Sequence, residues 1–227
     1  TLPLTVDELK LVLRCAELDW SNIEPSIFGT LFERGLDPDK RSQQGAHYTD
    51  PETIMKIVNP VVLEPWEREW ETEKAELARL LERAKRTVSE AAQQRYFAFL
   101  ERLHQFRVLD PACGSGNFLY LALRGLKDFE KKVIHEAEAL GLPAQFPRVG
   151  PEAVKGIEVN PYAAELARVT IWIGELQWMI ENGFGAAKNP ILKPLDQIEC
   201  RDAILNDDGT EPEWPTADVI IGNPPFL

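Results

Sequence analysis

The sequence predicts an α/β fold: an open, doubly wound parallel sheet of the Rossmann-like kind, preceded by an α-helical segment. From about residue 106 onward, short apolar runs alternate with segments of helical periodicity, as in strands joined by crossover helices. A glycine-rich turn follows the first of these runs directly, where such folds bind ligands. The composition, 44% hydrophobic and 27% charged, excludes collagen-like, low-complexity and disulfide-scaffold proteins.

The first hundred residues predict helices only. Thr5 and Glu8 can form a capping box ahead of a periodic apolar pattern, so we expect a helix over residues 5–19. A second helix is expected to begin near Pro25 and to end at Gly35. These helices form the start of the lead-in to the α/β part.

A polar loop separates this pair from the next helices. Thr49-Asp50-Pro51-Glu52 predicts a third helix that begins with a capping box and carries a proline in its first turn. Residues 66–104 are dense in both signs of charge and carry one apolar seam. This pattern predicts one long helix or a helical hairpin, with a mainly structural role.

The strands and crossover helices then follow in turn. Residues 106–110 predict the first strand, and a helix is expected from about Asn117. Helical spacing continues beyond residue 127, so residues 127–151 predict an extended helix and a loop ahead of the second strand, 153–159. Asn160-Pro161 caps a helix that should run to about residue 182.

Two further strands complete the predicted sheet. Residues 197–200 predict a short third strand. Residues 217–222 carry Val219, Ile220 and Ile221 in a row, which predicts a buried strand of the kind found inside parallel sheets.

The chain shows no sign of a membrane or secreted protein. No apolar run reaches the roughly 18 residues that a membrane span requires, and neither a signal nor a transit peptide opens the chain. The three cysteines lie far apart without a CxxC pair. We therefore expect a cytoplasmic protein with no membrane contact. Both ends of the chain look cut, since Thr1 is not a methionine and Leu227 follows a strand pattern closely.

The most specific motif is the string Asp-Pro-Ala-Cys-Gly-Ser-Gly-Asn-Phe-Leu over residues 110–119. Its two glycines, Gly114 and Gly116, let the backbone come close to a bound small molecule. No Lys-Ser/Thr follows, so the turn is not a phosphate-binding P-loop. A bare GxG occurs in many tight turns, and the specificity comes from the ten residues together.

This string resembles motif I of the S-adenosylmethionine-dependent DNA amino-methyltransferases, and is close to a signature of their adenine-N6 members. Gly45-Ala46-His47-Tyr48-Thr49 resembles motif X, and Gly156-Ile157-Glu158-Val159-Asn160 resembles motif II. Asp202 resembles the motif III acid, and Asn223-Pro224-Pro225-Phe226 resembles the catalytic motif IV. The order, with motif X first, is similar to the gamma type. The lead-in 27–44 resembles that of large MmeI-like restriction–modification enzymes.

The resemblance implies a fold, a reaction and partners. It implies a helical lead-in with motif X over residues 1–104, and the N-terminal part of a class I methyltransferase domain, an incomplete open sheet, over 105–227. The implied reaction is methyl transfer from S-adenosylmethionine to the N6 amine of adenine, within a restriction–modification or phage-defence enzyme. The implied partner is double-stranded DNA, bound through a target-recognition domain outside this chain. The chain by itself is expected to be inactive, and no metal is expected.

The resemblance also assigns a cofactor site. Glu158 would accept hydrogen bonds from both ribose hydroxyls, and Asp202 would accept from the exocyclic amine of the cofactor's adenine, beside Val159. Asp110 and the glycine loop would hold the methionine end. The implied cofactor residues are Tyr48, Thr49, Asp110, Ala112, Cys113, Gly114, Gly116, Asn117, Phe118, Glu158, Val159, Asp202 and Asn223. Cys113 belongs to the motif and is not required as a nucleophile.

The implied catalytic residues are Asn223, Pro224, Pro225 and Phe226. An exocyclic aromatic amine is a poor nucleophile because its lone pair is delocalised into the ring. The Asn223 side-chain carbonyl and the following backbone carbonyl can accept hydrogen bonds from that amine and draw it towards tetrahedral geometry. The prolines hold these acceptors rigid, and Phe226 offers a face on which a flipped base can stack.

The net charge of −12 is distributed unevenly along the chain. The excess is −5 over residues 1–65 and −7 over residues 196–227, whereas residues 66–195 are neutral. A protein that binds nucleic acid through phosphates should show a basic face. We expect that face in a portion beyond residue 227.

Two alternatives stay open at this point. A protein-glutamine N5 methyltransferase also uses Asn-Pro-Pro with an aromatic residue on an amide nitrogen, and the acidic charge would suit it. The chain could also be a non-catalytic S-adenosylmethionine-binding module of a defence complex.

Overall fold

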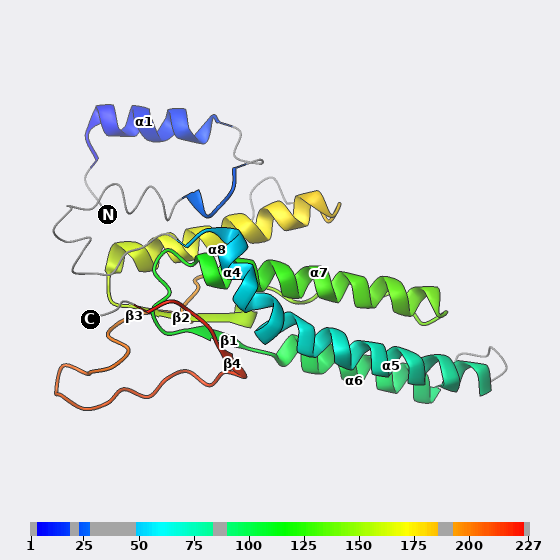
Figure 1. Cartoon of the computed structure of the whole chain (residues 1–227). Coiled ribbons are helices and arrows are strands. Elements are labelled where there is room, and N and C mark those ends of the chain that lie inside the picture. Colours follow the sequence, from blue (N-terminus) through cyan, green and yellow to red (C-terminus); the bar gives the residue numbers. More distant parts are fainter. Residues whose placement is uncertain (1–3, 19–22, 28–48, 84–89, 186–192, 225–227) are drawn as a thin grey trace.

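The computed structural model describes residues 4–18, 23–27, 49–83, 90–185 and 193–224 (Figure 1). It contains a four-stranded sheet with two helices on one face, beside a long helical hairpin. Most of the predicted helix from Pro25 to Gly35 and most of the motif X string lie outside the described residues. In the described part, no helix is both long and apolar enough to cross a membrane.

The first two described helices begin at side-chain caps. Helix α1 (Val6–Ala16) starts with the predicted capping box of Thr5 and Glu8. Helix α4 (Pro51–Val58) starts at Asp50, whose side chain accepts a hydrogen bond from the Thr53 N–H. The predicted capping box of Thr49 and Glu52 is therefore wrong, because Asp50 is the residue that caps this helix.

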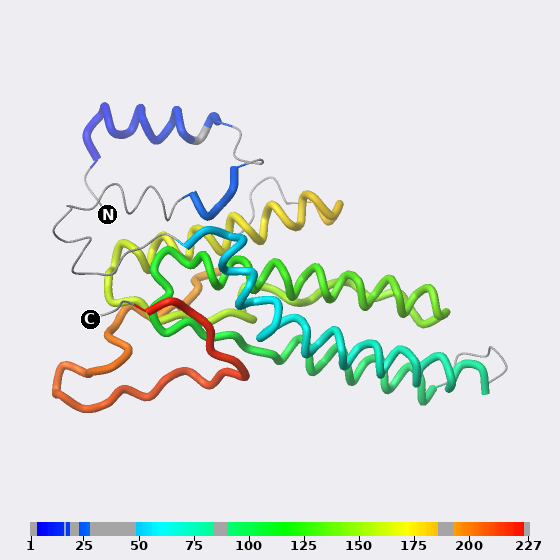
Figure 2. Tube along the Cα trace, in the orientation of Figure 1, coloured from blue at the N-terminus to red at the C-terminus, as the bar shows by residue number. Residues whose placement is uncertain are grey.

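The charge-dense segment forms a helical hairpin and not one long helix. A π-helical turn, η1 (Asn59–Leu63), joins α4 to α5 (Glu64–Arg83), and α6 (Glu90–Gln105) returns beside α5 (Figure 2). Ion pairs link the two arms, Arg95 with Glu73 and Arg102 with Glu69. These helices share one hydrophobic core with the sheet, so the proposed boundary at residue 104 stays a prediction.

The sheet has the predicted parallel topology. Its strands are β1 (Val108–Asp110), β2 (Val154–Glu158), β3 (Ile198–Cys200) and β4 (Val219–Ile220), in the order β3-β2-β1-β4. All three pairings are parallel. Helix α7 (Asn117–Ala139) connects β1 to β2 through the short helix η2 (Pro151–Ala153), and α8 (Pro161–Glu181) connects β2 to β3.

The two faces of the sheet are covered differently. A Cβ at Gly156 would lie 2.9 Å from Leu119 of α7, so this position faces the helices. The preceding residue, Lys155, faces the other way, and its Nζ donates to the Thr216 carbonyl. In the described chain, residues 212–216 of the β3–β4 connection lie against this second face, and residues 201–218 contain no helix of the kind that a doubly wound sheet predicts there.

Strand β4 is less buried than its sequence predicts. It pairs with β1 on one side and is the edge strand of the described sheet, so Ile220 is 54% exposed whereas Ile221 is buried. The expectation of a fully buried strand over residues 217–222 is wrong, because three β-branched residues in a row do not distinguish an edge strand from a central one.

A buried carboxylate fixes the inserted loop that follows α7. Glu130 is fully buried and accepts hydrogen bonds from His104 Nε2 at 2.6 Å, from the Arg148 N–H at 2.8 Å and from the Val149 N–H at 2.9 Å. It therefore joins α6, α7 and the loop ahead of β2. The extended helix plus loop predicted for residues 127–151 is confirmed.

Replacing Glu130 with alanine is expected to destabilise the fold by about 3–5 kcal/mol, because three donors, one buried and two partly buried, would lose their acceptor together. Urea unfolding of the variant measures this loss. Glu138→Ala is the matched control, since Glu138 lies exposed on the same helix and should change stability by less than about 0.5 kcal/mol. Equal effects of the two substitutions would contradict the role given to Glu130.

Candidate active site

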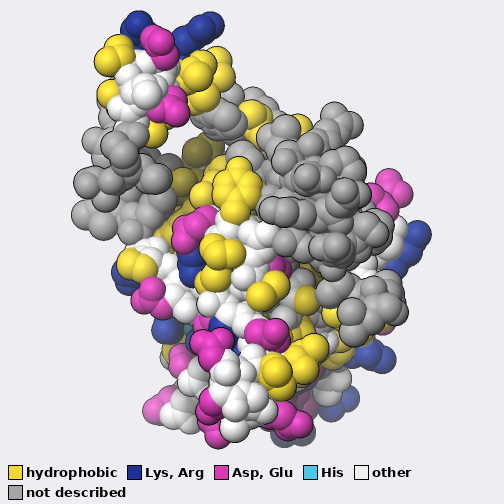
Figure 3. All heavy atoms as spheres, turned by 90° about the vertical axis from the view of Figure 1, so that its left-hand side faces the viewer, with side chains coloured by type: hydrophobic (Ala, Val, Ile, Leu, Met, Phe, Trp, Pro, Cys, Tyr) yellow, Lys and Arg dark blue, Asp and Glu magenta, His cyan; other side chains and the backbone are white. Residues whose placement is uncertain are grey.

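The candidate site lies where the strands end. In an open parallel sheet, ligands bind beyond the carboxyl ends of the strands, at the point where the strand order reverses. Here that point lies between β1 and β4. The ends of β1, β2 and β4 carry Asp110, Glu158 and Asn223. Figure 3 views this side of the molecule, on which apolar, acidic and basic side chains are all exposed.

The turn between β1 and α7 has the backbone that its glycines predict. Gly114 has φ +52° and Gly116 has φ +85°, both in the left-handed region that favours glycine. A Cβ at Gly116 would lie 3.0 Å from Ala167 of α8, so this glycine permits close packing. A Cβ at Gly114 would meet nothing within 4 Å. Gly114 therefore leaves its backbone open to a ligand.

Two carboxylates hold this glycine loop. Asp110 Oδ1 accepts from the Ala112 N–H at 3.0 Å. Glu158 Oε2 accepts from the Gly114 N–H at 2.8 Å, and Glu158 Oε1 accepts from the Asn160 N–H at 2.8 Å. A carboxylate has about four acceptor positions, so Glu158 can still accept hydrogen bonds from two ribose hydroxyls.

Burial changes the ionisation of two groups here. It raises the pKa of Asp110 to about 7, with the Glu158 carboxylate adding to the rise and the Ala112 N–H opposing it. Burial also raises the pKa of the Cys113 thiol, which keeps it protonated. A buried thiol of this kind is a poor nucleophile.

The remaining residues of motifs I and II differ in their surroundings. Asn117 Oδ1 is buried without a hydrogen-bond partner, so it is a free acceptor at the start of α7. Val159 is 64% exposed at the tip of β2, as expected of an apolar wall. Phe118 and Cys113 belong to the hydrophobic core, which favours packing roles for both. The open backbone at Gly114 and the free acceptor of Asn117 fit a small polar ligand such as S-adenosylmethionine.

Asp202 lies at the end of β3, next to the end of β2. The adjacent Arg201 donates its backbone N–H to the Glu158 carbonyl. Asp202 Oδ1 accepts from the Ile204 and Leu205 N–H groups, and these bonds lower the pKa of Asp202. One carboxylate oxygen thus shapes the turn, while Oδ2 can accept from a ligand amine.

Motif IV and motif X meet in the structure. Asn223 Nδ2 donates to Thr49 Oγ1 at 3.4 Å, across 174 positions of sequence. The end of motif X is therefore brought to the start of the predicted catalytic tetrapeptide. Tyr48, Pro225 and Phe226 lie outside the described residues, and Pro224 is exposed.

Gly222 is a site residue that the motifs did not single out. Its φ is +157°, and a Cβ there would lie 2.5 Å from Asp110 Oδ1. The backbone that leads to Asn223 therefore packs directly on the Asp110 carboxyl group. A glycine at the end of an apolar strand signals such a close approach, and this signal could have found it.

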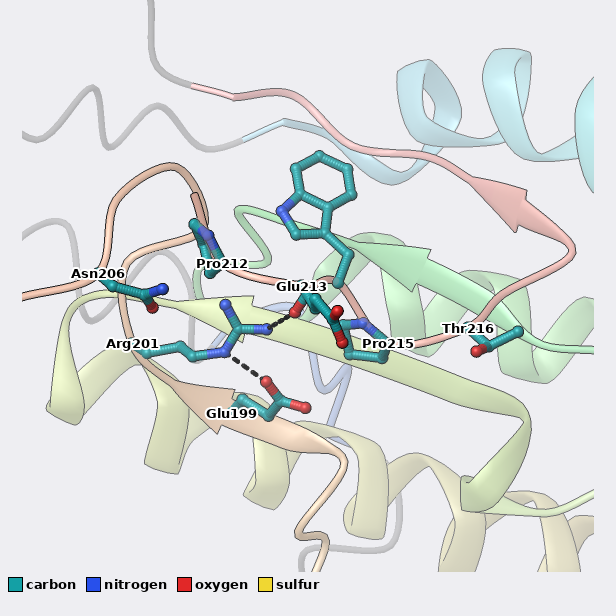
Figure 4. Close-up of a pocket in the computed structure, with 8 residues that line it drawn as sticks. Glu199, Arg201, Asn206, Pro212, Glu213, Pro215 and Thr216 are labelled. Atoms are coloured by element: carbon teal, nitrogen blue, oxygen red, sulfur yellow. Dashed lines mark hydrogen bonds and ion pairs between the residues drawn. The ribbon is translucent and has the colours of Figure 1, made fainter. Parts of the chain in front are cut away.

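A separate pocket of about 450 Å³ lies between the end of β3 and the β3–β4 connection. Arg201 lies in it between Glu199 and Glu213, donating to the Glu199 carboxylate and to the Glu213 carbonyl (Figure 4). These bonds already use the Arg201 guanidinium, and the pocket does not contain Asp110, Glu158 or Asn223. We therefore assign the site to the strand ends.

An open parallel sheet with a glycine loop after β1 and an acid at the tip of β2 defines the class: a Rossmann-like domain of the kind that binds a nucleoside cofactor at its strand ends. Residues 84–227 match the family model described as the MmeI DNA-methyltransferase domain. The chain belongs to this family.

Three known proteins resemble the chain. It is 30% identical over 236 residues to DNA methyltransferase A of Bacillus subtilis (strain 168), covering 100% of this chain and 25% of that protein. It is 27% identical over 173 residues to a putative type II restriction enzyme and methyltransferase of Methanocaldococcus jannaschii, covering 70% of this chain and 14% of that protein. The solved structure of the Type IIL restriction-modification enzyme MmeI in complex with DNA matches with a TM-score of 0.64 and 28% identity. That match covers 83% of this chain and 24% of MmeI. The chain thus spans a quarter or less of the length of each relative.

Proposed function

We propose that the protein transfers the methyl group of S-adenosylmethionine to the N6 amine of adenine in double-stranded DNA, as part of a restriction–modification or phage-defence enzyme. The observation that carries this proposal is the meeting of Asp110, Glu158 and Asn223 at one edge of the sheet, with Thr49 of motif X bonded to Asn223. Membership of the MmeI family supports DNA as the substrate.

The cofactor would be held by the glycine loop and the strand ends. Glu158 is already fixed by two backbone N–H groups, so it would meet the ribose hydroxyls with little reorganisation. Val159 and Asp202 would bind the adenine ring of the cofactor, and Asp110 and Asn117 would face its methionine part. When bound, S-adenosylmethionine supplies an electrophilic methyl group on a positively charged sulfur.

Asn223 would prepare the nucleophile. Its Oδ1 would accept a hydrogen bond from the target amine, while its Nδ2 is held by Thr49 Oγ1. Fixing the amide in this way keeps the oxygen turned to the substrate. Phe226 would stack on the target base after that base has left the duplex.

We place the DNA-recognition surface outside this chain. Asp110, Glu158 and Asp202 are the charged groups assigned to the site, and the neighbouring Arg201 is engaged by Glu199 and Glu213, whereas phosphate binding needs available Lys and Arg. A target-recognition domain elsewhere in the protein would supply them, and we propose that this chain alone does not methylate DNA. A cytoplasmic location follows from the proposed substrate.

Single-molecule sequencing of DNA from cells that express the intact gene tests the proposal. We expect N6-methyladenine at a reproducible position within one sequence context, and its loss when Asn223 is replaced with alanine. Methylation of cytosine N4, and not of adenine N6, would contradict the proposed target base. Unmodified DNA together with a methylated protein glutamine would favour the protein-methyltransferase alternative, and cofactor binding without any turnover would favour a non-catalytic module.

A further inference from the structure

Asp110 and Glu158 hold the same short loop from two neighbouring strands. Asp110 ends β1 and bonds the Ala112 N–H, and Glu158 ends β2 and bonds the Gly114 N–H. Asp110 is only 1% exposed. Gly222 closes over its carboxyl group from β4, so close that a Cβ there would lie 2.5 Å from Oδ1. Two carboxyl groups thus share one loop, and one of them is shielded from water.

Within the described part of the chain, no Lys, Arg or His forms an ion pair with either carboxyl group. The groups that act on Asp110 are the Glu158 carboxylate of β2 and the Ala112 N–H of the loop, with the Cys113 thiol and the uncharged Gly222 backbone beside them. Arg168 of α8 is engaged by Glu165 and by the carbonyls of Leu195 and Ile198. From α7, Asn117 adds a neutral amide near the loop.

Asp110 and Glu158 therefore have no positively charged partner in the described part of the chain. A buried carboxylate beside a second carboxylate is unfavourable unless a cation or a proton compensates it. We propose that Asp110 is a charge-sensing residue: a large fraction of its carboxyl groups hold a proton while the site is empty and release it to solvent when S-adenosylmethionine binds. This inference rests on the proposed function. The Asp110 O–H bond breaks, the proton passes to water, and the carboxylate that remains faces the cationic part of the cofactor.

The ionisation of Asp110 supports the proposal. With a pKa of about 7 in the empty protein, about half of the Asp110 groups carry a proton at neutral pH. A cation close to a carboxyl group favours its ionised form. The demethylated product has a neutral thioether in place of the sulfonium, so it should release fewer protons. Asp110 would therefore favour the cofactor over its product, which makes it a specificity-determining residue.

Calorimetry on the intact gene product tests this. S-adenosylmethionine is titrated at about pH 7 in phosphate and in Tris, two buffers that differ strongly in ionisation enthalpy. We expect release of about half a proton more from the wild type than from Asp110→Asn. Across pH 6 to 8, wild-type affinity should gain up to about tenfold relative to that variant, because deprotonated Asp110 has no proton to lose. The cofactor's own amino group titrates equally with both proteins and cancels in the difference.

Asp207→Asn is the matched control, since Asp207 is exposed in the β3–β4 connection; it should behave as the wild type. Binding with identical proton release in wild type and Asp110→Asn would overturn the charge-sensing role and leave the proposed function standing. Absence of binding heat in every buffer would instead overturn the proposed function. If Asp110→Asn does not fold, the wild type alone decides: the demethylated product must release fewer protons than S-adenosylmethionine, and equal release overturns the inference.

Discussion

Replacing Asn223 with alanine is expected to lower kcat for DNA methylation by about 100- to 1,000-fold, the usual effect of removing one preorganised polar group from a reacting centre. The affinity for S-adenosylmethionine should change by less than about threefold, since Asn223 bonds Thr49 and none of the groups that hold the glycine loop. The intact protein is assayed for methyl transfer to DNA and, by calorimetry, for cofactor binding.

A catalytic role predicts a loss of kcat with almost unchanged cofactor affinity, whereas a structural role predicts a loss of both. Asn206→Ala is the matched control, because Asn206 bonds Thr210 within the β3–β4 connection and should leave both quantities unchanged. Unchanged kcat in Asn223→Ala would contradict the amine-polarising role. A parallel loss of kcat and of cofactor affinity would show that Asn223 acts through the cofactor site.

Local signals in the sequence predicted most of the elements. The capping box of Thr5 and Glu8 and the cap of Asn160 both mark helix starts that the structure confirms. Helical spacing beyond residue 127 correctly predicted the long helix α7. These signals succeed because caps and periodicity depend on residues within a few positions of each other.

Features that depend on distant residues were less predictable. The sequence of β4 does not show that it lies at a sheet edge, and nothing near residue 201 shows that the following connection covers a sheet face without a helix. In the site, the resemblance assigned Thr49 and Asn223 to one cofactor site, but it did not predict the hydrogen bond between them. The position of Gly222 at the end of an apolar run signals a close approach, but its partner Asp110 follows from the pairing of β4 with β1, which the local sequence does not show.

Glu158 is expected to dominate cofactor affinity. Glu158→Ala should weaken S-adenosylmethionine binding by at least about 100-fold, because two hydrogen bonds to a charged acceptor contribute about 1.5–3 kcal/mol each, or about 3–6 kcal/mol together. The substitution would also remove the acceptor of the Gly114 and Asn160 N–H groups, so only the bond from the Cys113 N–H to the Ile157 carbonyl would still join the glycine loop to β2. Both effects act in the same direction, and calorimetry on the intact protein measures their sum.

A pair of further variants separates these two effects. Glu158→Gln keeps an acceptor oxygen for the Gly114 N–H while removing the charge, so its loss of affinity should be intermediate. Glu165→Ala removes a carboxylate from the exposed side of α8, outside the strand ends, and should bind the cofactor as the wild type does. If Glu158→Ala binds as tightly as Glu165→Ala, then Glu158 does not hold the ribose, and its two backbone hydrogen bonds are its whole role. Affinity lost equally in Gln and Ala variants would instead show that the charge, and not loop position, determines binding.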